Sequence, residues 1–158
     1  MRKDRLKIYA GWVVFAEAVG GLSGWLTRNG VKVYNANVIQ PPLAPPSIVF
    51  PVVWAILFAL MGIGAARIYM SRSSKARMRA LALFFVQLAF NFLWSIIFFN
   101  YQAFGLALAW IIVLLALIIA MIIAFLKVDR PAGYMQIPYA VWVAFATYLN
   151  YGVWKLNG

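Results

Sequence analysis

The chain has 158 residues, of which 66% are hydrophobic and 11% are charged. A soluble domain carries about 45–50% apolar and about 25% charged residues, so this chain has too few polar groups to cover a water-facing surface. The net charge of +11 comes from basic residues that lie mostly between apolar runs, which favours membrane topology and anionic headgroups over nucleic acid. The lack of cysteine and histidine excludes disulfides and removes the usual metal and haem ligands.

Five apolar runs approach the length of about 20 residues that a membrane-spanning helix needs. They cover residues 8–26, 47–70, 79–99, 104–126 and 133–154. The runs are continuous rather than alternating in polarity, which argues against a β-barrel. The sequence therefore predicts an all-α integral membrane protein, a five-transmembrane-helix bundle forming a single domain over residues 1–158. We expect the first run to be kept rather than cleaved, because four more spans follow it.

The basic residues predict an orientation for this bundle. Most of them fall at the N-terminus and in the connections after the second and fourth runs. Short basic loops stay on the cytoplasmic side of a cell membrane. We therefore expect a cytoplasmic N-terminus and an external C-terminus.

The first connection, residues 27–46, is long and rich in asparagine and proline. Long connections are often lids or binding loops. A disordered connector is the alternative, and the prolines count against it because they restrict the chain. We expect Pro45 and Pro46 at the start of the second span, where a missing N–H costs little, and Pro41 and Pro42 in the extended approach to it.

Three predicted spans carry aromatic and amide side chains at helical spacing. They are Trp54, Phe58 and Met61 in the second span, Gln87, Asn91, Trp94 and Ser95 in the third, and Tyr139, Trp142, Ala146 and Asn150 in the fifth. Polar side chains inside a membrane are costly and usually face the bundle interior. Each set therefore forms a stripe along one face of its helix. Together the three stripes indicate a pocket for a flat apolar ligand with polar edges, and ordinary helix packing is the alternative.

Three further features lie within the spans. Glu17, near the middle of the first span, is either a partner for a neighbouring helix or a proton or ligand site. Gly20 and Gly24 form a GxxxG pattern that lets helices approach closely, within or between protomers. Pro138 predicts a bend in the fifth span, because the carbonyl of Tyr134 loses its helical donor.

Three segments resemble the TspO/MBR family of translocator proteins and tryptophan-rich sensory proteins. They are "PPSIVFPVVWAILFALMGIGA", "QLAFNFLWSIIFF" and "IPYAVWVAFATYLNYGVWK", which have the family's order and spacing. The resemblance implies a five-helix bundle, usually a homodimer, with a cavity closed by the first loop. It also implies ligands such as protoporphyrin IX, haem, sterols and benzodiazepine-type compounds.

The stripes and the resemblance together give the candidate ligand-binding residues. They are Tyr34, Pro45, Trp54, Phe58, Asn91, Trp94, Tyr139, Trp142 and Ala146. The segment "LNYGVWK" also resembles the family's sterol-recognition pattern, through Leu149, Tyr151 and Lys155, although interfacial anchoring explains a tyrosine and a lysine equally well. The chain departs from the family's loop pattern at Val33 and Leu43, where tryptophan is usual.

We interpret the protein as a membrane receptor or binding protein for porphyrins, and for sterols or other flat lipophilic ligands, in tetrapyrrole handling, transport or stress signalling. Aromatic walls would stack on the ligand, and Arg28 and Lys32 could attract its propionates, although simple solvation explains both equally well. Without histidine, any haem would be held by shape rather than by strong axial ligation. The alternative is a light- and oxygen-dependent porphyrin-degrading enzyme that uses Trp54 and Trp142. No nucleophile, metal cluster or acid–base pair is visible in the sequence, and no required cofactor is expected.

Overall fold

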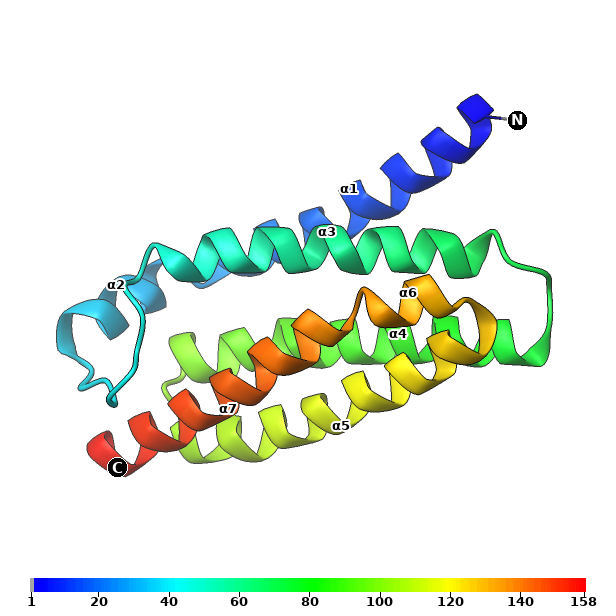
Figure 1. Ribbon diagram of the computed structural model, residues 1–158. Helices are drawn as coiled ribbons and strands as arrows, with labels where there is room; N and C mark the ends of the chain where they lie inside the picture. The colour runs from blue at the N-terminus through cyan, green and yellow to red at the C-terminus, as the bar shows by residue number, and fades with distance from the viewer. Residues whose placement is uncertain (1) are drawn as a thin grey trace.

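The computed structural model describes residues 2–158, which form seven α-helices, one short π-helix and no strand. The helices make an elongated bundle with the two termini at opposite ends (Figure 1). The five long helices are α1 (Arg2–Leu26), α3 (Val49–Tyr69), α4 (Lys75–Ser95), α5 (Phe104–Val128) and α7 (Ile137–Asn157). The short ones are α2 (Arg28–Asn37), η1 (Ile96–Asn100) and α6 (Arg130–Tyr134).

Three of the helical segments are long and apolar enough to cross a membrane. They are α3, α4 together with η1, and α5, whose mean hydropathy reaches 3.2. Large apolar side chains also cover the outer surface of α5, among them Ile112, Val113 and Ile119. Soluble monomers rarely expose contiguous apolar surface of this kind, whereas a bilayer covers it with lipid. The fold is therefore that of an integral membrane protein.

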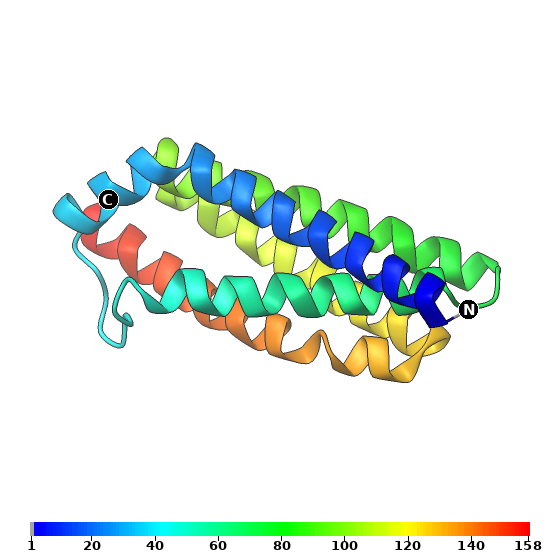
Figure 2. The ribbon, with the colours of Figure 1, turned by 90° about the horizontal axis from the view of Figure 1, so that it is seen from above.

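The closest helix pairs are α4 with α5 and α1 with α3, while α5 also packs along α7 (Figure 2). Glycine makes the α1–α3 contact possible. A Cβ added at Gly62 on α3 would lie 2.5 Å from the Cα of Val13, and one added at Gly20 on α1 would lie 2.6 Å from the ring of Phe58. Gly24 has open space around it. Only the first glycine of the predicted GxxxG pattern therefore serves packing within this chain.

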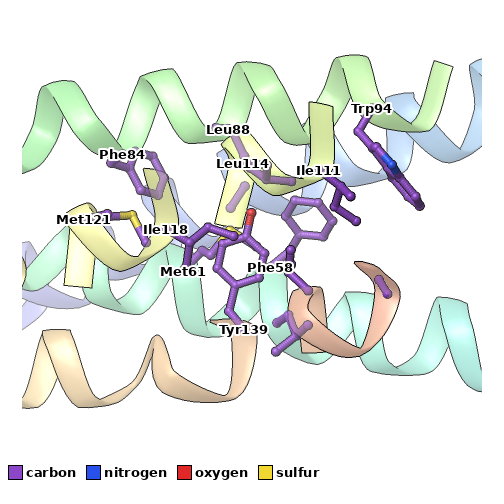
Figure 3. Close-up of a cluster of buried hydrophobic side chains, with 14 of the residues drawn as sticks. Phe58, Met61, Phe84, Leu88, Trp94, Ile111, Leu114, Ile118, Met121 and Tyr139 are labelled. Carbon is purple, nitrogen blue, oxygen red and sulfur yellow. The ribbon is translucent and has the colours of Figure 1, made fainter. Parts of the chain in front are cut away.

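The core lies at the centre of the bundle, where α3, α4, α5 and α7 face one another (Figure 3). Figure 3 shows Tyr139 reaching from α7 toward Met61 on α3 and the apolar side chains of α5. The largest side chains that are fully enclosed here include Met61, Phe84, Ile111, Leu114, Ile118, Met121 and Tyr139. This enclosed position explains how α4 and α7 carry polar side chains at the centre of the bundle.

The bend expected at Pro138 takes the form of a break. Helix α6 ends at Tyr134, and α7 begins at Ile137, so Pro138 is the second residue of α7, where its missing N–H costs little. Gln136 lies in the break and donates a hydrogen bond from Nε2 to the carbonyl of Leu60 on α3, at 2.9 Å. The break is therefore tied to the neighbouring helix.

The first connection differs from the loop expected over residues 27–46, because α2 occupies half of it. The helical path continues from α1, since the amide of Val31 donates to the carbonyl of Thr27 at 2.8 Å. Only residues 38–48 are irregular. The expectation that α3 starts at Pro45 and Pro46 is wrong, because α3 begins at Val49 after a turn in which Val49 N donates to Pro46 O at 3.0 Å.

Candidate ligand-binding site

A chain of buried hydrogen bonds joins α4 and α7 in the middle of the bundle. Asn91 donates from Nδ2 to the Tyr139 hydroxyl at 2.8 Å, and that hydroxyl donates to Gln87 Oε1 at 2.6 Å. Gln87 Nε2 in turn lies 3.9 Å from the sulfur of Met61 on α3. Gln87 and Asn91 are one helical turn apart on α4, which is why both reach the same phenol. Two predicted site residues, Asn91 and Tyr139, are therefore in direct contact.

A second buried pair lies toward the end of the bundle that carries the C-terminus. Trp94 on α4 donates from its indole N–H to Asn150 Oδ1 on α7 at 3.0 Å. Asn150 donates from Nδ2 to the carbonyl of Phe104, in the first turn of α5, at 2.9 Å. The Asn150 side-chain amide thus forms hydrogen bonds with both α4 and α5, and it holds the Trp94 ring in one orientation.

The aromatic members of the predicted site cluster where α3 faces α7. The ring of Trp54 lies 5.7 Å from that of Phe58 and 6.2 Å from that of Tyr139. Further along, the ring of Phe50 lies 5.8 Å from that of Trp142. Since α3 packs mainly on α1, large side chains rather than close backbone contact fill the space between α3 and α7. That space is therefore lined by rings, as a wall for a flat ligand would be.

Trp142 has a feature that sequence reasoning cannot supply. Its indole nitrogen is enclosed, yet it has no hydrogen-bond partner within residues 2–158. A buried donor without a partner is rare, because it loses its bonds to water without replacement. Ala146, one turn further along α7, is a small buried side chain. Trp142 therefore offers a free donor on the wall of the predicted site.

Tyr34, expected in a lid, lies on α2 and is buried against the π-helix η1. Its ring lies 5.3 Å from that of Phe98 and 5.3 Å from that of Phe99. Phe98 in turn stacks on Trp94 at 5.0 Å. Burial raises the pKa of the Tyr34 hydroxyl to about 12. Tyr34 thus contacts the predicted site through Phe98, which stacks on Trp94.

The irregular segment 38–48 is fastened to the last turns of α7. Asn157 accepts from the amide of Ile39 at 3.0 Å and donates to the carbonyl of Ile39 at 2.8 Å. The Tyr148 hydroxyl donates to the carbonyl of Pro42 at 2.9 Å. Pro41 packs against Gly152, where an added Cβ would lie 2.5 Å from the proline ring. This segment therefore forms a strap across the end of the bundle.

Other predicted residues have simpler surroundings. Pro45 is half-buried within the strap segment. Arg28 lies 4.3 Å over the ring of Trp25 and donates to its backbone carbonyl, whereas Lys32 is exposed. Glu17 is half-buried on α1. No cluster of histidine, cysteine, aspartate or glutamate that could hold a metal occurs in residues 2–158.

The residues of the predicted sterol pattern face different ways. Leu149 is buried, while Tyr151 and Lys155 are exposed on the outer face of α7. The Lys155 ammonium lies 5.8 Å from the Tyr151 ring and 5.7 Å from the Trp154 ring. Tyr151 and Lys155 thus form a cation–π pair on the surface of the bundle.

Two hollows lie apart from the predicted residues. One of about 500 Å³ opens between α2 and η1, and another of about 260 Å³ lies between α4 and α5. The first is lined by Leu26, Asn29, Gly30, Val33, Phe99, Asn100, Tyr101 and Gln102. Sequence reasoning did not select these residues, nor the strap partners Tyr148 and Asn157. Helical spacing identifies residues only within the apolar runs, whereas most of these positions lie at or beyond helix ends.

The fold and this interior define a class: a helical integral membrane protein whose centre combines tryptophan and tyrosine rings with buried amides. The TspO/MBR family model matches residues 9–155, and the chain belongs to that family. It is 35% identical over 141 residues to the tryptophan-rich protein TspO of Chlorobaculum tepidum, covering 89% of each chain. It is 31% identical over 149 residues to the translocator protein of Bos taurus, covering 93% of this chain and 88% of that one.

A third relative is named as a sensory protein. The tryptophan-rich sensory protein of Cereibacter sphaeroides is 37% identical over 121 residues, or 77% of this chain and 75% of that protein. The resemblance drawn from three segments of the sequence is thus confirmed at the level of the family.

Proposed function

We propose that the protein is a membrane-embedded binding protein for porphyrins and related flat lipophilic ligands. The observation that carries the proposal is the enclosed indole N–H of Trp142, which lacks a partner within residues 2–158 and stands on an aromatic wall. A carboxylate or carbonyl on the edge of a ligand would satisfy that donor. Family membership supports the proposal, since relatives are named translocator and sensory proteins.

The ligand would lie between α3 and α7. Trp54, Phe58 and Tyr139 offer ring faces and edges, and aromatic groups stack favourably on other flat π-systems. The small side chain of Ala146 leaves room for a ligand beside the ring of Trp142. Entry would require the rings that now touch across α3 and α7 to separate. The ligand's binding energy therefore has to exceed what those ring contacts contribute.

The strap over residues 38–48 would serve as the lid of this site. It crosses the end of the bundle and ends two residues before Phe50, whose ring lies 5.8 Å from that of Trp142. A few side-chain hydrogen bonds to α7 hold it. Exposed hydrogen bonds of this kind contribute little stability each, so the strap can open without unfolding a helix.

We further propose that α1 and α7 also cross the bilayer, giving five spans with a cytoplasmic N-terminus. Both helices exceed twenty residues, enough to cover the hydrocarbon thickness at 1.5 Å per residue. The chain has no cysteine, so single cysteines at Lys3 and Asn37, which flank the apolar part of α1, and at Arg130 and Gly158, which flank α7, can be labelled selectively in sealed vesicles. Five spans require the two positions of each pair to be labelled from opposite sides, and labelling of a pair from one side would refute the crossing of that helix.

The binding proposal is tested by titrating protoporphyrin IX into the purified protein in the dark, with quenching of tryptophan fluorescence as the readout. Trp142→Phe keeps a ring but removes the free donor, and we expect roughly tenfold weaker binding, the effect of one hydrogen bond to a charged group. Trp25→Phe, which changes an exposed tryptophan at the end of α1, is the matched control. Equal affinity in the wild type and both variants would place the ligand elsewhere.

Illumination separates binding from porphyrin degradation. With a binding protein, the Soret band of protoporphyrin IX should fade under light and oxygen no faster than it does without protein. A faster loss of the band in the wild type, which is absent in both Trp54→Phe and Trp142→Phe, would refute the binding proposal and support the degrading enzyme.

A further inference from the structure

The hollow of about 260 Å³ between α4 and α5 lies at the end of the bundle opposite the strap, away from the proposed porphyrin site. It is lined by Ala76, Arg79 and Leu83 of α4 and by Ala120, Ile123, Ala124 and Lys127 of α5. The first set has helical spacing of three and four residues, and so does the second, so each is one stripe on one helix. The hollow is therefore a groove along the α4–α5 contact.

The groove has a polar end and an apolar floor. Arg79 lies in the second turn of α4 and Lys127 in the last turn of α5, so both cations stand near the membrane surface. Leu83 and Ala120 lie one to two turns deeper. The three alanines leave the groove open, because they bring no side chain beyond Cβ. A cationic mouth above an apolar channel matches the two parts of a phospholipid.

The two cations are free to bind an anion. Neither the Arg79 nor the Lys127 side chain has a hydrogen bond or an ion pair within residues 2–158, whereas the nearby Arg77 side chain donates twice to the carbonyl of Tyr69. No acidic residue lines the groove. Asp129, which follows α5, is held by Arg67 at 2.7 Å. The mouth of the groove therefore carries uncompensated positive charge.

We propose that this groove binds one anionic phospholipid, with its phosphate between Arg79 and Lys127 and an acyl chain along the floor. Basic pockets between spanning helices recognise anionic headgroups through charge, and the long lysine and arginine stems cover apolar surface while reaching the interface. The hollow is smaller than the roughly 300–1,000 Å³ of a site that encloses a drug-sized molecule. Its size suits a headgroup and part of one chain, and excludes a whole macrocycle.

The test uses the full chain in detergent, with retained lipid counted by native mass spectrometry. Phosphatidylglycerol is the anionic probe, and phosphatidylcholine with the same acyl chains is the neutral one. We expect one phosphatidylglycerol to be retained in preference. Arg79→Gln with Lys127→Gln should weaken its retention by about 25-fold, since each basic residue near an anionic lipid is worth roughly a factor of five.

Arg5→Gln with Lys7→Gln is the matched control, because it removes the same two residue types from the exposed first turns of α1 at the same end of the bundle. It should retain phosphatidylglycerol like the wild type. An equal loss in this control would reduce the effect to general surface charge and overturn the site. Circular dichroism and a thermal unfolding curve verify that each variant is folded.

Ala120→Leu tests the floor of the groove without changing charge. A leucine there fills the channel, so we expect retention to fall while both cations remain. Unchanged retention would overturn the acyl-chain part of the proposal. Displacement of the lipid by the same concentration of inorganic phosphate would identify a plain anion site and overturn the choice of a lipid.

Discussion

Tyr139 on α7 donates its phenolic proton to Gln87 on α4 at 2.6 Å, in the middle of a membrane-spanning bundle. The same oxygen accepts from Asn91 at 2.8 Å, so one hydroxyl satisfies two amides of another helix. In a hydrocarbon medium no water can replace these bonds. The pairing therefore fixes the register between α4 and α7, and with it the position of the aromatic wall.

Tyr139→Phe removes only the hydroxyl and leaves Gln87 and Asn91 without that partner. We expect the free energy of unfolding to fall by about 1–2 kcal/mol, because two buried polar groups become unsatisfied, although interhelical bonds in membranes average less than this. Unfolding of the purified protein by denaturing detergent measures the change. Tyr148→Phe, which removes a hydroxyl at the exposed strap, is the control and should cost less. Equal losses in the two variants would contradict the central role of Tyr139.

Trp94 and Asn150 should be energetically coupled. The bond between them is 3.0 Å long, and Asn150 also serves the carbonyl of Phe104. A double-mutant cycle of Trp94→Phe and Asn150→Leu should give a coupling energy of about 0.5–3 kcal/mol, the range for groups in direct contact. The same cycle between Trp94→Phe and Tyr148→Phe serves as a distant pair and should give a value near zero. A coupling near zero in the first cycle would show that the hydrogen bond contributes nothing.

The membrane class, the family and the stripes on α4 and α7 could be read from the sequence, because each depends on local pattern. Helical spacing places Gln87, Asn91 and Trp94 on one face, and the structure indeed brings the first two to a single tyrosine. The partner of Trp94, Asn150, was on the α7 stripe, but nothing in the sequence pairs these two residues. Pairings of that kind depend on how the helices pack.

The ends of the helices were harder to predict, because side chains distant in sequence decide them. Asparagine and proline in the first connection argued for a loop, yet burial of Tyr34 against Phe98 and Phe99 favours the helix α2. Pro45 and Pro46 looked like a helix start, and the turn before Val49 places them outside it. The free donor of Trp142 could not be foreseen, because an unsatisfied group is recognised only when its surroundings are known.

The strap should open when its side-chain bonds to α7 are removed. Asn157→Ala deletes both bonds to Ile39, and Tyr148→Phe deletes the bond to Pro42. We expect faster hydrogen exchange in residues 38–48 of the double variant, especially at the Ile39 amide, with no change in α5. Asn37→Ala, an exposed asparagine at the end of α2, is the control. Wild-type exchange in the double variant would show that Pro41 packing alone holds the strap.

A lid also predicts a kinetic effect. Opening the strap should speed both the association and the release of protoporphyrin IX in stopped-flow quenching, with a smaller change in affinity, because a gate alters the path more than the end states. Faster exchange in residues 38–48 without any change in either rate would separate the strap from ligand entry.

The Arg67–Asp129 pair should make stability depend on acid. Arg67 donates to Asp129 at 2.7 Å and 3.2 Å, and these bonds hold the pKa of the Asp129 carboxyl below its usual range. A lowered folded pKa means that the contribution is complete above the unfolded pKa of about 4, and is lost as the pH falls through the folded value. Because the pair is partly exposed to solvent, we expect about 0.5–1 kcal/mol at pH 7.

Asp129→Asn isolates the charge, because the amide oxygen can still accept from Ala132 N, which Asp129 caps at 3.0 Å. Thermal unfolding should show this variant less stable than the wild type at pH 7, with the two curves converging as the pH is lowered well below 4. Asp129→Ala removes the cap as well, and a helix cap contributes about 1 kcal/mol more. That additional loss should persist in acid, because a protonated carboxyl keeps an oxygen that can accept from the amide. A gap between wild type and Asp129→Asn that stays constant with pH would contradict the ion pair as its source.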